Sequence, residues 1–197
     1  EGFNSDSTTE NCWTILNVNG DADLWDTNYA VNQFEGDEVA AMYSWFNGGD
    51  DDDYLISPGF ALTGNERLKF HQRIQSSGYP NNFEVLLSSS GISTDSFTNV
   101  LLANETYDNE SYVEHIVDLS AYSGDSYIAF RVPPGASGYR LYIDNFIIET
   151  IPACVEPTDL SATASSFNDA TLAWSGDDSA SSYEVVIQAA GTGAPTT

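Results

Sequence analysis

Oxygen-bearing side chains recur at every second residue near the start of the chain, in the run Asn17-Val18-Asn19-Gly20-Asp21-Ala22-Asp23-Leu24-Trp25. Hard cations such as Ca²⁺ prefer about six to eight oxygen ligands. A glycine within such a run lets the backbone curl around an ion. The spacing therefore predicts a calcium loop with a structural role, whose candidate ligands are Asn17, Asn19, Asp21 and Asp23.

Two other interpretations of this run can be weighed from the residues. An EF-hand loop requires glycine at its sixth position and glutamate at its twelfth, but these positions hold Ala22 and Asn28, and the flanking residues lack helical periodicity. The EF-hand is therefore excluded. A solvated Asn/Asp/Gly turn between two strands needs no metal and stays open as an alternative.

Residues for catalysis are scarce. The two histidines, His71 and His115, lie far apart in the sequence, inside strand-like stretches and without a nucleophile or metal motif nearby. The four aspartates of residues 50–53 would point in alternating directions along an extended chain, so we expect them to form a solvated loop rather than an acid/base pair. The sequence predicts no enzyme activity for this chain.

Aromatic residues near turns favour ligand binding instead. Sugar-binding β-sandwiches offer exposed rings to sugar faces and amides or carboxylates to hydroxyls. The candidates for this role are Trp45, Tyr79 and Tyr139, with Tyr122 as a further one. The alternative is that these rings belong to the core or its rim.

The chain is strongly acidic. It has 197 residues with Lys+Arg 5 and Asp+Glu 30, a net charge of −25. This charge argues against binding to nucleic acid or to an anionic membrane surface, because both reward clustered lysine and arginine. It favours cations, neutral ligands such as glycans, or basic protein partners. No run of about 18 apolar residues is present, so we expect no membrane insertion. The start at Glu1, without methionine or an apolar leader, indicates a mature or excised piece.

Short alternating segments separated by Gly, Pro, Asn and Asp predict an all-β protein. About nine strands are expected over residues 13–16, 39–46, 54–56, 68–74, 83–87, 97–102, 112–117, 127–132 and 139–148. This many strands in one domain predict a jelly-roll β-sandwich. Residues 1–11 are polar and aperiodic, so they are expected to form an arm or linker, and residues 12–152 the sandwich.

The composition changes after Pro152, where Ser, Ala and Thr become frequent and basic residues stop. The segments Pro157-Thr158-Asp159-Leu160, Ala170 to Trp174 and Tyr183 to Ile187 resemble the first three strands of a fibronectin type III module. Such a module has about seven strands. Residues 153–197 are therefore predicted to form an incomplete fibronectin type III-like β-sandwich.

The two cysteines, Cys12 and Cys154, bracket the predicted sandwich. If the first and last strands lie side by side, a disulfide can join them and would stabilise the fold by roughly 4 to 5 kcal/mol in the chain-entropy model. Two unrelated thiols are the alternative.

The order of several motifs resembles one known family. Cys12-Trp13-Thr14, the loop before Trp25, Ala41 to Trp45, the acidic run before Tyr54, and the closing strand Tyr142 to Ile148 follow one another as in the cleaved-adhesin, or choice-of-anchor J, domains. These are MAM-like jelly rolls of secreted Bacteroidetes proteins. The resemblance covers about residues 10 to 150. It implies that Asp53 and Asp144 join the loop residues as Ca²⁺ ligands, although asparagine at positions 17 and 19 lowers the charge of the site.

The resemblance also implies a function. It indicates a non-catalytic, calcium-stabilised adhesion module on a large extracellular protein, exported by type IX secretion and attached to the cell surface or released. Its partners would be a glycan or an extracellular host protein, and neighbouring domains of the same polypeptide. The alternatives are a spacer or targeting domain accessory to an enzyme elsewhere in a longer chain, and a jelly-roll hydrolase or lyase.

Overall fold

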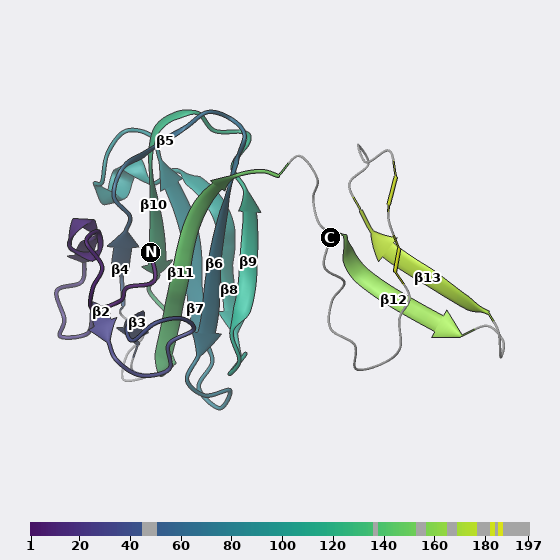
Figure 1. Ribbon diagram of the computed structural model, residues 1–197. Helices are drawn as coiled ribbons and strands as arrows, with labels where there is room; N and C mark the ends of the chain where they lie inside the picture. Colours follow the sequence, from purple (N-terminus) through teal and green to yellow (C-terminus); the bar gives the residue numbers. More distant parts are fainter. Residues whose placement is uncertain are drawn as a thin grey trace. The chain divides into compact units, whose positions relative to one another are not determined.

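Two antiparallel β-sheets stacked face to face form the main unit of the computed structural model (Figure 1). The structure describes residues 1–44, 51–135, 138–152, 157–164, 169–176, 182–183 and 185–186. The chain divides into two compact units, Glu1–Thr150 and Ile151–Thr197. Within the described residues, no helix is long and apolar enough to cross a membrane.

The six-stranded sheet has the order β1-β4-β10-β7-β8, and β5 pairs with β10 beside this path. Its strands are β1 (Thr14–Asn17), β4 (Asp53–Ile56), β5 (Phe60–Leu62), β7 (Asn81–Ser88), β8 (Asn99–Tyr107) and β10 (Gly124–Val132). The five-stranded sheet has the order β2-β3-β11-β6-β9. Its strands are β2 (Trp25–Tyr29), β3 (Val39–Tyr43), β6 (Glu66–Ile74), β9 (Val113–Asp118) and β11 (Arg140–Thr150). Short 3-10 turns lie at Glu10–Cys12 and Thr94–Ser96.

The core lies between the sheets and follows from strand alternation. Along β6, buried and half-buried residues alternate without interruption over nine positions, as expected of a strand with one face in a core. Leu55, Val85 and Phe130 enter the core from the six-stranded sheet, and Phe70 and Ile143 enter it from the five-stranded sheet. The prediction of an all-β sandwich is confirmed.

The sequence pattern missed two strands, β2 and β5. Three of the five residues of β2 are Asp26, Thr27 and Asn28, which carry no apolar alternation, and β5 has only three residues. The first and last strands of the sandwich, whose adjacency was the condition for the predicted disulfide, are not neighbours. β1 pairs with β4 at the edge of one sheet, whereas β11 lies between β3 and β6 in the other.

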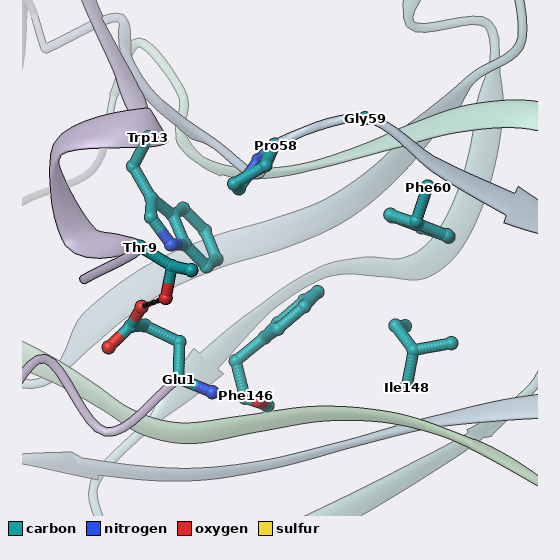
Figure 2. A pocket seen from close by; sticks show the side chains of 8 residues that line it. All are labelled: Glu1, Thr9, Trp13, Pro58, Gly59, Phe60, Phe146 and Ile148. Atoms are coloured by element: carbon teal, nitrogen blue, oxygen red, sulfur yellow. Dashed lines mark hydrogen bonds between the residues drawn. The ribbon is translucent and has the colours of Figure 1, made fainter. Parts of the chain in front are cut away.

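The first eleven residues do not form the expected arm. Phe3 is fully buried in the core, and its ring packs 5.1 Å from that of Trp13, which in turn lies 5.0 Å from Phe146. The backbone of Glu1 pairs with that of Phe146 in both directions. Figure 2 shows the indole of Trp13 beside Phe146 and the hydrogen bond that Thr9 donates to the Glu1 carboxylate. The prediction failed because one phenylalanine among polar residues gives no periodic signal.

The segment at residues 30–38 covers the outer face of the five-stranded sheet. Asp144 in β11 accepts hydrogen bonds from the backbone N–H groups of Phe34 (2.8 Å) and Glu35 (3.3 Å). The Phe34 ring stacks on His71 at 3.6 Å. Asn4 joins this cover, since its Oδ1 accepts a hydrogen bond from the backbone N–H of Asp37 at 3.1 Å. The cover and the N-terminal segment therefore hold each other on the sheet.

The second unit contains one antiparallel pair, β12 (Thr158–Ala164) and β13 (Ala170–Ser175). Trp174 and Tyr183, which belong to two of the segments that resemble fibronectin type III strands, have ring centroids 5.5 Å apart. The third expected strand, residues 183–187, includes positions outside the described residues. The fibronectin type III identity of this unit stays a prediction.

Replacing Phe3 by alanine tests the role of the N-terminal segment. Because Phe3 is fully buried, the Phe3→Ala variant should lose about 3 to 5 kcal/mol of unfolding free energy in denaturant titration. Phe34→Ala, at a ring that is 45% exposed, should cost clearly less. A loss of unfolding free energy in Phe3→Ala that is no larger than the loss in Phe34→Ala would contradict the burial of Phe3 and favour an arm at residues 1–11.

Gly36→Ala tests the contact between the cover and the N-terminal segment. Gly36 has φ +72°, and a Cβ there would lie 1.5 Å from Oδ1 of Asn4. We expect a loss of about 2 kcal/mol or more, because left-handed strain and a steric clash add. Gly20→Ala is the matched control, since Gly20 has φ +74° and open space around it. Unfolding free energies that are equal in the two variants would contradict this contact, whereas partial rescue of Gly36→Ala by Asn4→Ala would support it.

Candidate functional site

The Asn17 to Trp25 loop is closed by its own hydrogen bonds. Oδ1 of Asn17 accepts from the backbone N–H of Gly20 (2.6 Å), and Nδ2 of Asn17 donates to the carbonyl of Asp21 (2.9 Å). The Asp21 carboxylate accepts from Nδ2 of Asn19 (2.7 Å) and from the backbone N–H of Asp23 (2.9 Å). Asn and Asp side chains often stabilise turns in this way. The loop thus has the local geometry of a turn.

Asp53 lies directly beside this loop, at the start of β4. It is opposite Asn17 in the β1–β4 register, and its carbonyl accepts a long hydrogen bond, 3.4 Å, from Nε1 of Trp25. Strand alternation sends Asp53 inward, whereas Asp52 points outward and forms an ion pair with Arg131 at 2.8 Å. The alternating directions expected for the acidic run are therefore observed.

The expectation that the acidic run is a solvated loop is wrong for Asp51 and Asp53, which are 3% and 0% exposed. Asp50 lies outside the described residues. Neither carboxylate oxygen of Asp53 has a hydrogen-bond partner among the described residues. Burial, followed by the negative charges of Asp21 and Asp51, raises the pKa of Asp53 to about 7.

Asp144 occupies a different part of the sandwich. It lies in the five-stranded sheet, opposite His71, and its carboxylate accepts three backbone hydrogen bonds, from Phe34, Glu35 and Asn145. Burial raises its pKa, and these three N–H groups oppose the rise. The family resemblance implies that Asp144 binds Ca²⁺ together with the Asn17 loop. Asp144 lies in the five-stranded sheet, whereas β1, which leads into the loop, lies at the edge of the other sheet, and the role of Asp144 as a ligand stays a prediction.

The donor chemistry beside Asp53 fits a hard cation. A buried carboxylate without a hydrogen-bond partner is costly unless an opposite charge compensates for it, and the acidic side chains of Asp21 and Asp51 act on the same group. Within the described residues, however, no three acidic, histidine or cysteine side chains are arranged closely enough to hold a metal ion. Asp21, Asp51 and Asp53, with Asn17 alongside, supply the oxygen donors that a hard cation prefers, but in the part of the chain that the structure describes they are not gathered into a metal site.

Two of the predicted ligand-binding tyrosines lie together. The ring centroids of Tyr79 and Tyr139 are 6.4 Å apart, and Tyr139 is 5.2 Å from Tyr43. Tyr79 is 50% exposed. Trp45, the third predicted residue, lies outside the described residues. Tyr122 packs against the core instead.

A polar hollow adjoins these rings. It has a volume of about 430 Å³ and is lined by Ala22, Asp23, Leu24, Trp25, Asp26, Tyr43 and Arg140. The Arg140 guanidinium lies 4.5 Å from the centroid of Tyr29 and 4.7 Å from that of Tyr43. We name Tyr29, Tyr43, Tyr79, Tyr139 and Arg140 the tyrosine–arginine cluster. Its rings and the polar groups of the hollow can contact a ligand with both apolar and hydroxyl surfaces.

Sequence reasoning missed Arg140, Tyr29 and Tyr43. Arg140 follows Tyr139 directly, so its position beside a predicted ring was a usable signal. Tyr29 and Tyr43 meet it only because β2, β3 and β11 are neighbours in the sheet.

A second hollow, of about 250 Å³, lies where the N-terminal segment meets the sandwich (Figure 2). Its lining is largely apolar, with Trp13, Phe60 and Ile148. The Glu1 carboxylate at its edge already accepts hydrogen bonds from Ser7, Thr9 and the backbone of Phe3. This hollow offers fewer available polar groups than the first.

The histidines are placed as structural residues. In the β6–β9 register, His71 is opposite Glu114 and His115 is opposite Phe70, so the two imidazoles lie on opposite faces of the sheet. His71 stacks on Phe34 and His115 stacks on Phe70. Burial lowers the pKa of both imidazoles.

Cys12 is exposed and forms no disulfide with a described residue. Its predicted partner, Cys154, lies outside the described residues, so the disulfide stays a prediction.

The sequence is similar to that of a bacterial hemagglutinin. The chain is 27% identical over 175 residues to Hemagglutinin A of Porphyromonas gingivalis, with 75% of this chain covered. It spans only 7% of that protein's length.

Solved structures show the same fold. The K1 cleaved adhesin domain of Lys-gingipain from Porphyromonas gingivalis has a TM-score of 0.64 and 23% identity, covering 77% of this chain and 97% of that domain. The K2 domain of Lys-gingipain has a TM-score of 0.61 and 22% identity, with 77% and 98% covered. The CBM22-1 xylan-binding domain of Xyn10C from Paenibacillus barcinonensis has a TM-score of 0.50 and 12% identity, with 77% and 92% covered.

The model of the Cleaved Adhesin Domain family matches residues 1–148. This match begins at Glu1 and so includes the segment that carries the buried Phe3. With its two-sheet sandwich and the similarity to domains of Lys-gingipain, the chain belongs to the Cleaved Adhesin Domain family.

Proposed function

We propose that this chain is a non-catalytic adhesion module of a larger extracellular protein, which binds a glycan or protein ligand through the tyrosine–arginine cluster. The observation that carries this proposal is the contact of Tyr43, Tyr139 and the half-exposed Tyr79 beside a polar hollow. Exposed tyrosines of this kind are typical of binding surfaces. The similarity to Hemagglutinin A and to adhesin domains supports the same role and an extracellular or cell-surface location.

A spacer or targeting role within a longer protein is the second candidate. The matched domains are parts of larger proteins, and this chain covers a small fraction of Hemagglutinin A. A spacer would need the stable sandwich but not the tyrosine–arginine cluster. Binding measurements therefore separate the two candidates.

A glycan array and a panel of purified extracellular matrix proteins test the adhesion function. We expect the wild-type chain to bind at least one ligand, and Tyr79→Ala or Tyr139→Ala to weaken that binding by about tenfold or more, as for an aromatic residue at the centre of an interface. Ile116→Ala is the control, because Ile116 is 55% exposed on β9, outside the cluster. Absence of any binding, or equal losses in all three variants, would favour the spacer.

The proposed module is also stabilised by calcium. Asp53 carries this part of the proposal, since its buried carboxylate has no hydrogen-bond partner among the described residues. Asp21, Asp51 and Asp53 would hold the ion with Asn17, and the ion would neutralise their charge and tie β4 to the Asn17 loop. Asn19 and Asp23 would support the loop, and Asp144 would hold residues 34 and 35 instead of the ion.

Thermal unfolding with and without calcium tests this site. For a typical extracellular site, about 10 mM Ca²⁺ adds roughly 1.4 to 2.7 kcal/mol by linkage, so the Tm should rise by roughly 3 to 10 °C. Asp53→Asn should abolish this rise. Asp52→Asn is the matched control: it removes an outward-facing ion pair with Arg131, lowers stability slightly and leaves the calcium response intact.

The same two variants should also differ in how their stability depends on pH when a chelator is present. The pKa of Asp53 is raised from 3.8 to about 7 in the folded protein, so the folded state binds more protons than the unfolded state between these values. Wild-type stability should therefore fall as the pH rises through this window. Asp53→Asn should flatten the fall and melt above wild type at pH 8, whereas Asp52→Asn should keep it. A calcium response that survives in Asp53→Asn, or a wild type without metal by elemental analysis, would contradict the site.

A further inference from the structure

Arg140 is positioned differently from the other basic residues of the sandwich. Arg67, Lys69 and Arg131 form ion pairs with carboxylates, and Arg73 donates to the carbonyl of Ile74 at 3.2 Å. The Arg140 guanidinium has neither an ion pair nor a hydrogen bond with the residues that the structure describes. It is held by the rings of Tyr29 and Tyr43 through cation–π contacts.

This arrangement leaves the donors of Arg140 available to a ligand. A guanidinium has five N–H groups in one rigid plane, and contact with ring faces uses its charge without consuming those donors. Arg140 lines the hollow together with Asp23 and Asp26. The rings therefore fix an arginine whose hydrogen-bonding capacity the described residues do not use.

Acceptors lie in the same hollow. The Asp23 carboxylate accepts no hydrogen bond from the described residues. It lies close enough to Arg140 and to Tyr43 to interact with both electrostatically. Asp26 already accepts from the backbone N–H of Asn28 at 3.0 Å, which leaves Asp23 as the more available acceptor. A planar donor and a carboxylate acceptor side by side suit adjacent hydroxyl groups, because each hydroxyl can accept from one and donate to the other.

Charge selects among possible ligands. Asp23 and Asp26 line the hollow and the chain carries a net charge of −25, so an acidic sugar would be repelled. A basic peptide would face the positive charge of Arg140 at the same place. A neutral sugar avoids both costs, and the rings of Tyr43, Tyr139 and Tyr79 continue away from the hollow as surfaces for further sugar units.

We propose that the hollow is a binding site for a neutral oligosaccharide, in which Arg140 and Asp23 hold adjacent hydroxyls of one sugar and the tyrosines contact its neighbours. This inference rests on the proposed adhesion function and names the ligand class and the residues that select it. It assigns Asp23 to the ligand rather than to the cation.

The test is titration calorimetry of the full chain with three sets of probes: neutral oligosaccharides of gluco, galacto and manno configuration, uronate-containing oligosaccharides, and a lysine-rich peptide. We expect binding to at least one neutral oligosaccharide and weaker or no binding to the other two sets. Arg140→Lys, which keeps the charge but loses the planar fork, and Asp23→Asn should each weaken this binding by about tenfold to a hundredfold.

Arg67→Lys is the matched control, because Arg67 lies in the same sheet but is paired with Glu149 at 2.6 Å. Its affinity for the oligosaccharide should equal that of wild type. The Tm of each variant shows whether it folds. If Arg140→Lys disturbs the packing of Tyr29 and Tyr43, Asp23→Asn still tests whether the hollow binds the oligosaccharide.

Three outcomes would overturn the inference: no neutral oligosaccharide binds, uronates or the peptide bind more tightly, or Arg140→Lys and Asp23→Asn bind as wild type does. If Tyr79→Ala and Tyr139→Ala abolish capture of a protein ligand while the hollow variants have no effect, the adhesion function stands and the sugar site fails. If none of these ligands binds, both fail.

Discussion

Strand β11 is buried on both faces, and the arrangement of the sandwich depends on it. Leu141 and Ile143 point into the core between the sheets, whereas Tyr142 and Asp144 point to the other face, where residues 30–38 cover them. A strand that is buried on one face only would leave that cover without an anchor. The same strand begins at Arg140 and pairs through Phe146 with the backbone of Glu1. One strand thus joins the core, the cover, the N-terminal segment and the polar hollow.

Two buried carboxylates are stabilised in different ways. Asp144 receives three backbone N–H groups and fixes the residues that cover the outer face. Asp53 is equally buried but has no hydrogen-bond partner among the described residues, and three further carboxylates, those of Asp21, Asp51 and Asp52, act on it. Since an uncompensated buried charge is expensive, the first carboxylate is explained by the fold alone. The second is explained by a bound proton or by a cation, and these two states respond oppositely to pH.

The chain has only 5 basic residues beside 30 acidic ones, and each basic residue has a defined position in the sandwich. Arg131 is bound between Asp52 and Glu84 on the outer face of the six-stranded sheet. Arg67 and Lys69 share Glu149 across the five-stranded sheet. Partly exposed pairs of this kind contribute little to stability individually. Arg73 also lies near two rings, those of Tyr112 and Tyr142, but Arg140 both contacts two rings at shorter distance and lines a hollow. Its position is therefore better explained by recognition than by charge balance.

The sequence by itself determined the fold class and the direction of individual side chains along each strand. The period of two in β6 predicted its buried face, and the same rule separated the inward Asp53 from the outward Asp52. The order of short motifs indicated the family to which the chain belongs. Only the tertiary structure decided which strands are neighbours: it placed Asp144 and strand β1 in different sheets, buried Phe3, and brought Tyr29 and Tyr43 to Arg140. The physical reason is that alternation fixes which face of a strand is buried, whereas the pairing of distant strands depends on packing the whole core, which no local pattern records.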